Sequence, residues 1–449
     1  DDPLYERQWN LRAMGAPAGW ALTPRGRGIV VAVIDTGVAQ VEDLAGTEVL
    51  EGASFVPGVE SARDDQGHGT HVAGTIAQTT NNGIGVAGVA PAATILPVKV
   101  LSASGSGQSA WIAAGIDWAV DEGADVINLS LGGGYSEVIH TAIRKARAHG
   151  VLVVAAAGNS GREGVSWPGA LPEAIGVGAM GPTNEPAPYS SWGEGVDLSA
   201  PGGDKRRPNG GILQDTIDGR GGHAYQEFQG TSMATPHVAG AAAVLLSTGL
   251  PVGAVERILL DTARGTGRWD AHTGWGQLDV GRAVQRVNDV WGATRFGLAA
   301  ALAGVVAWLG RAGNRYGAAS ALVAAWFAGG LFALPHLGGG DARWLQIASQ
   351  GVLAWPSIVS PSLMHFPPWL AAGIPAIAAV TLGAFRGTRA VAAGIAVGAG
   401  AHLLHGAATG SLAPWWLGSL GGLWLGLNAA LCLGLGLALA GSHHLETRK

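Results

Sequence analysis

The last third of the chain is almost free of charged residues, and this feature constrains its fold more than any other. Residues 291–449 carry eight Lys/Arg and two Asp/Glu, whereas residues 1–290 carry 19 and 30. Several uncharged runs in the tail reach the roughly 18–20 residues that a helix needs to cross the hydrocarbon core of a bilayer. We therefore expect a water-soluble domain at 1–289 and a membrane domain at 290–449.

The charge balance also limits the possible functions. The front part carries a net charge of about −11 and the tail about +6. An acidic front part argues against nucleic-acid binding, which needs a basic face. The single cysteine, Cys432, lies in the apolar tail, so no disulfide can form within the chain. A domain of about 290 residues is large enough to be held by its core instead.

The first twenty residues lack the basic-then-apolar pattern of a secretory signal, and the sequence does not begin with Met. We expect that a signal and a propeptide have been removed, unless the sequence simply begins here.

Short apolar runs alternate with helical patterns through the front part. Residues 28–34 form a β-branched run that ends in a turn, as a buried parallel strand does. Such alternation predicts a doubly wound α/β domain with a mostly parallel sheet, here followed by an all-α transmembrane bundle. Further strands are expected at 94–100, 126–131, 151–157 and 174–179, and helices at 68–78, 110–122, 136–149, 231–246 and 280–287.

Three reactive side chains lie where these elements begin or end. Asp35 leaves the first strand, while His68 and Ser232 open helices. In open α/β sheets, ligands bind beyond the carboxyl ends of the strands. A serine hydroxyl needs an imidazole to take its proton, and a buried carboxylate fixes the tautomer of that imidazole. The three residues therefore predict a nucleophilic centre, and the N-terminus of the Ser232 helix favours a developing oxyanion.

The sequences around these residues resemble the signature blocks of the subtilisin-like serine proteases, or subtilases. The blocks are VIDTGV at 33–38, HGTHVAG at 68–74 and GTSMATPHVAG at 230–240. Their order, Asp then His then Ser, is that of this family and not of α/β-hydrolases, and Ala234 breaks the G-x-S-x-G elbow. The resemblance covers residues 1–289. It implies a fold of subtilisin type and a serine endopeptidase that works through an acyl-enzyme intermediate.

The resemblance implies further site residues. Asn159 would be the oxyanion donor together with the Ser232 backbone N–H, although an asparagine here can also simply end a strand. An edge after the strand at 126–131 would pair with the substrate backbone. Small residues would line an open pocket for the P1 side chain, unless the glycines serve only turns. The implied substrate-binding residues are Ser130, Leu131, Gly132, Gly158, Ser166 and Gly169.

The segment TNNGIGV at 80–86 resembles the calcium loop of the family. Calcium prefers oxygen ligands, including backbone carbonyls. The alternative is an Asn-Gly-rich loop without an ion. The implied ligands are the side chains of Asp2, Asp43 and Asn82 and the carbonyls of Thr80, Ile84 and Val86.

Two other polar groups are open to more than one interpretation. Asp64, Asp65 and Gln66 form either a second, weaker ion site or a solvated acidic loop, which we favour. His71 and His237 lack a carboxylate or cysteine at metal-ligand spacing, so structural roles are expected and zinc is not.

Charge sets the expected number of membrane spans. Clear apolar runs lie at 316–337, 362–385, 390–409 and 415–440, and a fifth at 291–310 is long enough if Arg295 snorkels. Five spans that start outside place the basic loops at 311–315 and 386–389 and the C-terminus inside, which satisfies the positive-inside rule. We therefore expect the protease domain on the extracytoplasmic side and the interrupted run at 343–360 in or near the interface.

The predicted spans contain two features of interest. Gly394 and Gly398 are one turn apart, which lets helices approach closely. His402 and His405 lie on one helical face in an apolar run, where a proton or metal role is possible. The spans contain no acidic partner, which argues against a pump.

Three functions are consistent with this sequence. The first is a membrane-anchored endopeptidase that acts on exported or membrane proteins, with polypeptides and the lipid bilayer as partners. The second is an inactive protease-like membrane protein that binds peptides or an unknown membrane partner. The third, a transporter with an attached protease, is disfavoured because its spans would lack charged residues.

Overall fold

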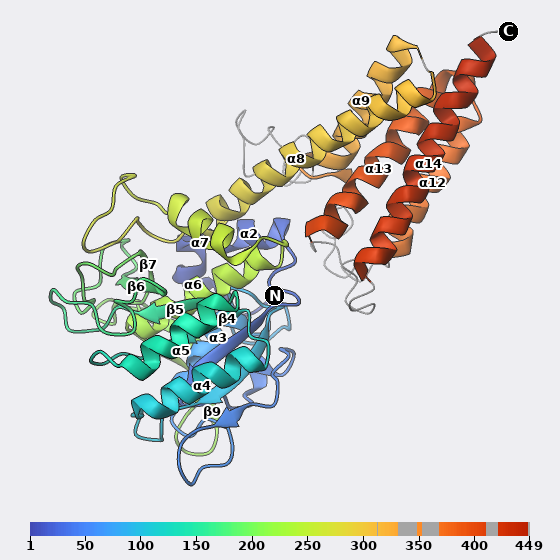
Figure 1. Ribbon diagram of the computed structural model, residues 1–449. Coiled ribbons are helices and arrows are strands. Elements are labelled where there is room, and N and C mark those ends of the chain that lie inside the picture. Colours follow the sequence, from blue (N-terminus) through green and yellow to red (C-terminus); the bar gives the residue numbers. More distant parts are fainter. Residues whose placement is uncertain (312, 331–347, 353–367, 410–420, 448–449) are drawn as a thin grey trace. The chain divides into compact units, whose positions relative to one another are not determined.

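The computed structural model describes residues 1–311, 313–330, 348–352, 368–409 and 421–447 (Figure 1). By its internal contacts the chain divides into two compact units, Asp1–Val284 and Gln285–Lys449.

A seven-stranded sheet forms the centre of the first unit, in the order β2-β3-β1-β4-β5-β6-β7, and every pairing is parallel. The chain first adds strands on one side of β1 and then, from β4, on the other. The predicted doubly wound fold is thereby confirmed. The strands are β1 (Val30–Asp35), β2 (Ala53–Ser54), β3 (Thr94–Lys99), β4 (Val126–Leu129), β5 (Leu152–Ala156), β6 (Ile175–Met180) and β7 (Leu198–Pro201).

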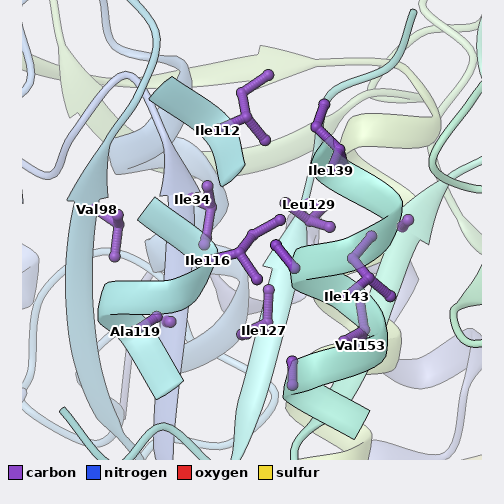
Figure 2. Packing of buried hydrophobic residues seen from close by; sticks show 14 of the residues in the cluster. Ile34, Val98, Ile112, Ile116, Ala119, Ile127, Leu129, Ile139, Ile143 and Val153 are labelled. Carbon is purple, nitrogen blue, oxygen red and sulfur yellow. The ribbon is translucent and has the colours of Figure 1, made fainter. Parts of the chain in front are cut away.

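Helices cover both faces of this sheet. On one face, α4 (Ser109–Asp121) and α5 (Glu137–Ala148) bury isoleucines against the strands, among them Ile116 and Ile143 (Figure 2). The other face is covered by α3 (His68–Ala77) and α6 (Thr231–Leu246). Almost every residue of α6 is buried, which its small Ala and Gly side chains permit. The helices η1 (Tyr5–Arg7), α1 (Trp9–Ala13), α2 (Ala16–Leu22), η2 (Glu42–Leu44) and α7 (Val252–Asp261) complete this part of the chain.

An antiparallel hairpin of β8 (Ile212–Ile217) and β9 (His223–Phe228) was not expected from the sequence. The strand β8 buries three consecutive polar residues, Gln214, Asp215 and Thr216. It therefore lacks the alternation of apolar and polar residues by which a half-buried strand is recognised.

The second unit is helical. The helix predicted at 280–287 and the span predicted at 291–310 form one continuous helix, α8 (Val280–Leu309). The other helices are α9 (Asn314–Gly329), α12 (Pro368–Gly383), η6 (Arg386–Thr388), α13 (Arg389–Thr409) and α14 (Gly421–Thr447).

Three helices within the described residues are long and apolar enough to cross a membrane, namely Val280–Leu309, Arg386–Thr409 and Gly422–Ser442. The helices α9 and α12 have 16 described residues each, fewer than a span needs. The predicted spans at 316–337 and 362–385 extend into 331–337 and 362–367, which lie outside the described residues. The same holds for 415–420 and for most of 343–360.

The glycines of α13 allow it to lie close to α9. A Cβ atom added to Gly394 would lie 2.6 Å from Val323 Cβ, and one added to Gly398 would lie 2.8 Å from the Ala324 carbonyl oxygen. Larger residues do not fit at these distances. The small-residue pattern therefore serves helix packing.

Candidate active site

The geometry of the site begins at the carboxyl end of β1. Asp35 is the last residue of this strand and is fully buried. Its carboxylate oxygens lie 2.8 and 3.0 Å from His68 Nδ1, and the Thr36 N–H donates to Oδ1 at 2.7 Å. A buried carboxylate is stable only when hydrogen-bonded, so these contacts fix the imidazole in place.

The position of His68 depends on how α3 starts. The Gly69 N–H donates to Thr36 Oγ1 at 2.9 Å, and a Cβ on Gly69 would lie 2.1 Å from the Gly37 carbonyl oxygen. Only glycine permits so close an approach between the helix start and the turn after β1.

Asp64 and Asp65 both have hydrogen-bond partners within the protein. The Asp64 carboxylate is buried and accepts four bonds, from the backbone N–H groups of Gln66, Gly67 and Thr70 and from the Thr70 hydroxyl. Asp65 Oδ1 lies 2.8 Å from Lys99 Nζ. The two carboxylates therefore anchor the start of α3, and the acidic loop is not simply solvated.

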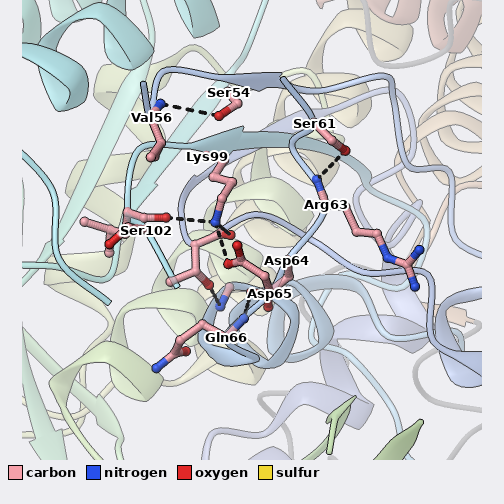
Figure 3. Close-up of polar contacts among 12 residues, drawn as sticks. Ser54, Val56, Ser61, Arg63, Asp64, Asp65, Gln66, Lys99 and Ser102 are labelled. Atoms are coloured by element: carbon pink, nitrogen blue, oxygen red, sulfur yellow. Dashed lines mark hydrogen bonds and ion pairs between the residues drawn. The ribbon is translucent and has the colours of Figure 1, made fainter. Parts of the chain in front are cut away.

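Lys99 ends β3 next to Asp35 in the sheet register and is fully buried. Its ammonium donates to the carbonyls of Thr36 and Leu101 at 2.6 and 2.9 Å, in addition to Asp65 (Figure 3). It thus connects the turn after Asp35 to the loop before His68. Lys99 was not expected from the sequence as a site residue, although a lone lysine that closes an apolar strand is a visible signal.

Opposing effects act on the pKa of His68. Burial lowers it, but the charge and hydrogen bond of the Asp35 carboxylate together raise it further, so the net pKa lies above the ordinary histidine value. Asp35 therefore stabilises the imidazolium that forms when His68 takes a proton.

Ser232 is the second residue of α6. It shares a cleft of about 470 Å³ with His68 and Asn159, lined also by Lys205, Phe228, Gln229 and Met233. The Ser130 hydroxyl donates to the Ser232 carbonyl at 2.8 Å, which connects the start of α6 to the end of β4. Among the described residues no hydrogen bond joins the Ser232 hydroxyl to His68, a contact that often tightens only when substrate binds.

The side chain of Asn159 is oriented by its neighbour Thr231. Its Oδ1 accepts from the Thr231 N–H and hydroxyl at 2.9 and 3.1 Å. The amide oxygen is therefore used within the protein, and the Nδ2 group remains to donate into the cleft. This is the orientation that an oxyanion donor requires.

The predicted substrate pocket is assembled from separate loops. A Cβ on Gly158 would lie 2.4 Å from Ser166 Oγ, and one on Gly132 would lie 3.1 Å from Ser166 Cβ, so these three residues meet. A Cβ on Gly169 would lie 2.5 Å from the Ala156 carbonyl oxygen. Gly169 therefore also permits close backbone packing.

Residues 26–276 match the subtilase family of peptidases. The chain belongs to this family. It is 47% identical over 238 residues to subtilisin Savinase of Lederbergia lenta, covering 53% of this chain and 83% of that protein. With subtilisin E of Bacillus subtilis it shares 45% identity over 246 residues, covering 53% of this chain and 61% of that protein. A protease structure from Pseudoalteromonas arctica superposes with a TM-score of 0.59 at 35% identity, covering 64% of this chain and 98% of the other.

These matches confirm the predicted fold and the predicted class, a subtilisin-like serine endopeptidase. The family match ends at residue 276, ahead of the helical second unit.

The predicted calcium ligands of this subtilase lie together. Asp43 is buried, and its two oxygens accept from Asn82 Nδ2 at 2.7 Å and from the Val86 N–H at 2.9 Å. Asp2 accepts from the N–H groups of Asn81 and Asn82 at 3.0 and 3.1 Å. Burial raises the pKa of Asp43 to about 6, as expected for a carboxylate that lacks a nearby positive charge.

The donor set fits calcium better than zinc. Within the described part of the chain, no group of three His, Cys, Asp or Glu side chains is arranged so that it could hold a metal ion. A cation at this loop would therefore rely on carbonyl and amide oxygens beside Asp2 and Asp43, which is the chemistry of calcium. To become a ligand, the Asn82 amide would present its oxygen where its nitrogen now faces Asp43.

The two histidines in the subtilase signature blocks have structural contacts. His71 Nε2 lies 2.9 Å from the Ile212 carbonyl oxygen, and its ring stacks on Phe228. His237 Nδ1 lies 2.7 Å from the Met233 carbonyl oxygen. Burial lowers the pKa of His71 to about 3 and that of His237 to about 4, so both are neutral near pH 7.

We predict that kcat/KM falls as the pH falls through the raised pKa of His68, because only the neutral imidazole accepts the serine proton. Asp35→Asn removes the charge that raises this pKa, so the acid limb should move to lower pH while kcat falls by about 10⁴. The profile is measured with a peptide substrate. An acid limb that stays in place in Asp35→Asn would contradict the assigned pairing.

Proposed function

We propose that this chain is a membrane-anchored serine endopeptidase that cleaves exported or membrane proteins, with Asp35, His68 and Ser232 as its triad. One observation carries the proposal: the buried Asp35 carboxylate contacts His68 Nδ1 at 2.8 Å, and His68 shares a cleft with Ser232. The three side chains come from β1, α3 and α6, so only the folded domain brings them together.

The triad performs the reaction in two stages. His68 Nε2 takes the hydroxyl proton as Ser232 Oγ bonds to the scissile carbonyl carbon. The Asn159 amide and the Ser232 N–H then bind the oxyanion. His68 gives its proton to the leaving amine, and the C–N bond breaks to leave an acyl-enzyme. Water, deprotonated by His68, repeats the attack and releases Ser232.

Substrate would lie across this cleft as an extended chain. Its acyl side pairs with residues 130–132, and its P1 side chain enters the pocket formed by Gly158, Ser166 and Gly169. The cleft is also lined by Lys205 and Phe228, which would contact the bound substrate.

Calcium would serve as a structural ion. Asp2, Asp43 and Asn82 would hold it through side-chain oxygens and Thr80, Ile84 and Val86 through carbonyls. The ion would join the N-terminal segment to the loop after α3, two segments far apart in the sequence.

We place the peptidase domain at 1–289 and the membrane domain, with about five transmembrane helices, at 290–449. Three apolar helices of sufficient length support membrane insertion. The basic loops at 311–315 and 386–389 support a cytoplasmic position for those loops and hence an extracytoplasmic protease.

A fluorophosphonate probe tests the proposed activity. We expect the full-length protein to be labelled and Ser232→Ala to remain unlabelled, because the probe reacts with an activated serine. Asn159→Ala should bind the same label but lose about 10²–10³ in kcat, a magnitude established in subtilisin itself and not worked out from this chain. A wild-type protein that is folded but unlabelled would favour the inactive, peptide-binding alternative.

Chelation tests the calcium proposal. Excess chelator should lower the Tm by about 5 °C or more, because a ligand that binds only the folded state stabilises it by mass action. Asp43→Asn should abolish the response to chelator. Asp121→Asn, at an exposed position on α4, should leave it intact. An unchanged Tm in the wild-type protein would refute the site.

Accessibility of the two termini tests the topology. A tag after Lys449 should resist added protease in intact cells, whereas a tag before Asp1 should be cleaved. Cleavage of the C-terminal tag from outside would contradict five spans.

A further inference from the structure

The helical unit contains a small group of hydrogen-bond donors, and two of its nitrogen atoms are buried without a partner, Trp291 Nε1 and His405 Nε2. Arg295 of α8 donates through Nε to His405 Nδ1 on α13 at 3.2 Å. Trp291 lies one turn before Arg295, and its ring meets that of His405 edge-on with centroids 4.8 Å apart. His405 is only 5% exposed. The helices α8 and α13 thus bring an arginine, a tryptophan and a histidine to one place.

The contact with Arg295 determines the tautomer of His405. A guanidinium has no acceptor, so Arg295 must be the donor and His405 Nδ1 the acceptor. Neutral His405 then carries its proton on Nε2. That nitrogen is buried and has no hydrogen-bond partner, and the same is true of Trp291 Nε1. Both unsatisfied atoms are therefore N–H groups, which need an acceptor.

The charge of Arg295 is also uncompensated. Within the described residues, no carboxylate forms an ion pair with Arg295, and the sequence from 291 to 449 contains only Asp341 and Glu446 as acids. Arg295 is only partly exposed, and a cation withdrawn from water without a counter-charge is unfavourable. The site therefore lacks both negative charge and hydrogen-bond acceptors.

Neighbouring polar residues, in contrast, have hydrogen-bond partners. His402, one turn before His405, has Nδ1 at 3.3 Å from the Ala328 carbonyl oxygen. Asn288 bonds to Gln350 and, at 3.4 Å, to Ser349. The surplus of donors is confined to Trp291, Arg295 and His405.

The position of these residues along their helices indicates the depth of the site. Arg295 immediately precedes the uncharged run of α8, and His405 lies one turn before the end of α13 at Thr409. Arg295 thus marks the boundary between the charged and the uncharged half of α8, and His405 lies near the last described residue of α13. We therefore expect both at the level of the lipid headgroups, where tryptophan is also enriched. The acceptor group with negative charge at that level is the lipid phosphate.

We propose that Trp291, Arg295 and His405 form a binding site for a phosphate group, supplied by an anionic phospholipid. The phosphate oxygens accept from the Arg295 terminal N–H groups, from His405 Nε2–H and from Trp291 Nε1–H, and the phosphate charge neutralises Arg295. A metal cation does not fit, because the site offers donors and a positive charge.

Native mass spectrometry of the full-length protein in detergent tests this site with three probes: phosphatidylglycerol, phosphatidylcholine and inorganic phosphate. We expect phosphatidylglycerol to bind at least about tenfold more tightly than zwitterionic phosphatidylcholine, because only its net charge neutralises Arg295. Arg295→Gln should abolish this preference. Trp291→Phe and His405→Phe keep the aromatic packing but remove one donor each, so each should weaken binding several-fold.

Arg311→Gln is the matched control, because it removes the same charge from an exposed position beyond the other end of α8. It should leave the preference intact. Fluorophosphonate labelling at Ser232 and far-UV circular dichroism report folding independently of the site.

The probes also distinguish the source of the phosphate. Inorganic phosphate that binds in an Arg295-dependent manner, without lipid preference, would assign the site to a soluble anion and overturn the lipid source. Phosphatidylglycerol binding that is equal in wild-type and Arg295→Gln, or reduced equally in Arg311→Gln, would overturn the site itself.

Discussion

The active site is organised around one buried charge, the Asp35 carboxylate at the end of an apolar strand. Such a group is stable in the interior only if donors surround it. The Thr36 N–H and His68 Nδ1 supply them, so α3 must begin where its first residue reaches Asp35. The Lys99 ammonium holds the Thr36 carbonyl and the loop before His68 in the same arrangement. Two buried side chains of opposite charge, on neighbouring strands, thus fix the position of His68 in the cleft.

Much of this arrangement was predictable from short segments of sequence. A local pattern marks each of three segments: the strand before Asp35, the helix start at His68 and the start of α6. The family resemblance then predicted that these segments form one site. What the sequence did not reveal depends on partners distant in the chain. The strand β8 is polar because its residues bond across the fold: Thr216 Oγ1, for example, donates to the Gly67 carbonyl. No local period predicts such a strand.

The acidic residues illustrate the same limit. Asp43 and Asp64 are both buried, and sequence alone offered an ion at either position. Asp64 accepts four hydrogen bonds that stabilise the start of α3, which leaves its oxygens little capacity to bind a cation. Asp43 accepts from Asn82 Nδ2 and the Val86 N–H and is also hydrogen-bonded to the Tyr225 side chain, beside the Asn-Gly-rich loop at 80–86. Asp64 thus serves a helix start and Asp43 lies beside a loop, and this difference is a property of the folded chain.

The balance of hydrogen-bond donors and acceptors also distinguishes two histidines of the helical unit. His402 and His405 are equivalent in sequence, three residues apart in an apolar helix. In the fold, His402 meets a backbone carbonyl, whereas His405 meets an arginine that can only donate. The first histidine is thereby satisfied, and the second is left with an N–H that points to no acceptor. A buried N–H without an acceptor favours a ligand that supplies one, whereas a donor at the surface of the protease domain is satisfied by water.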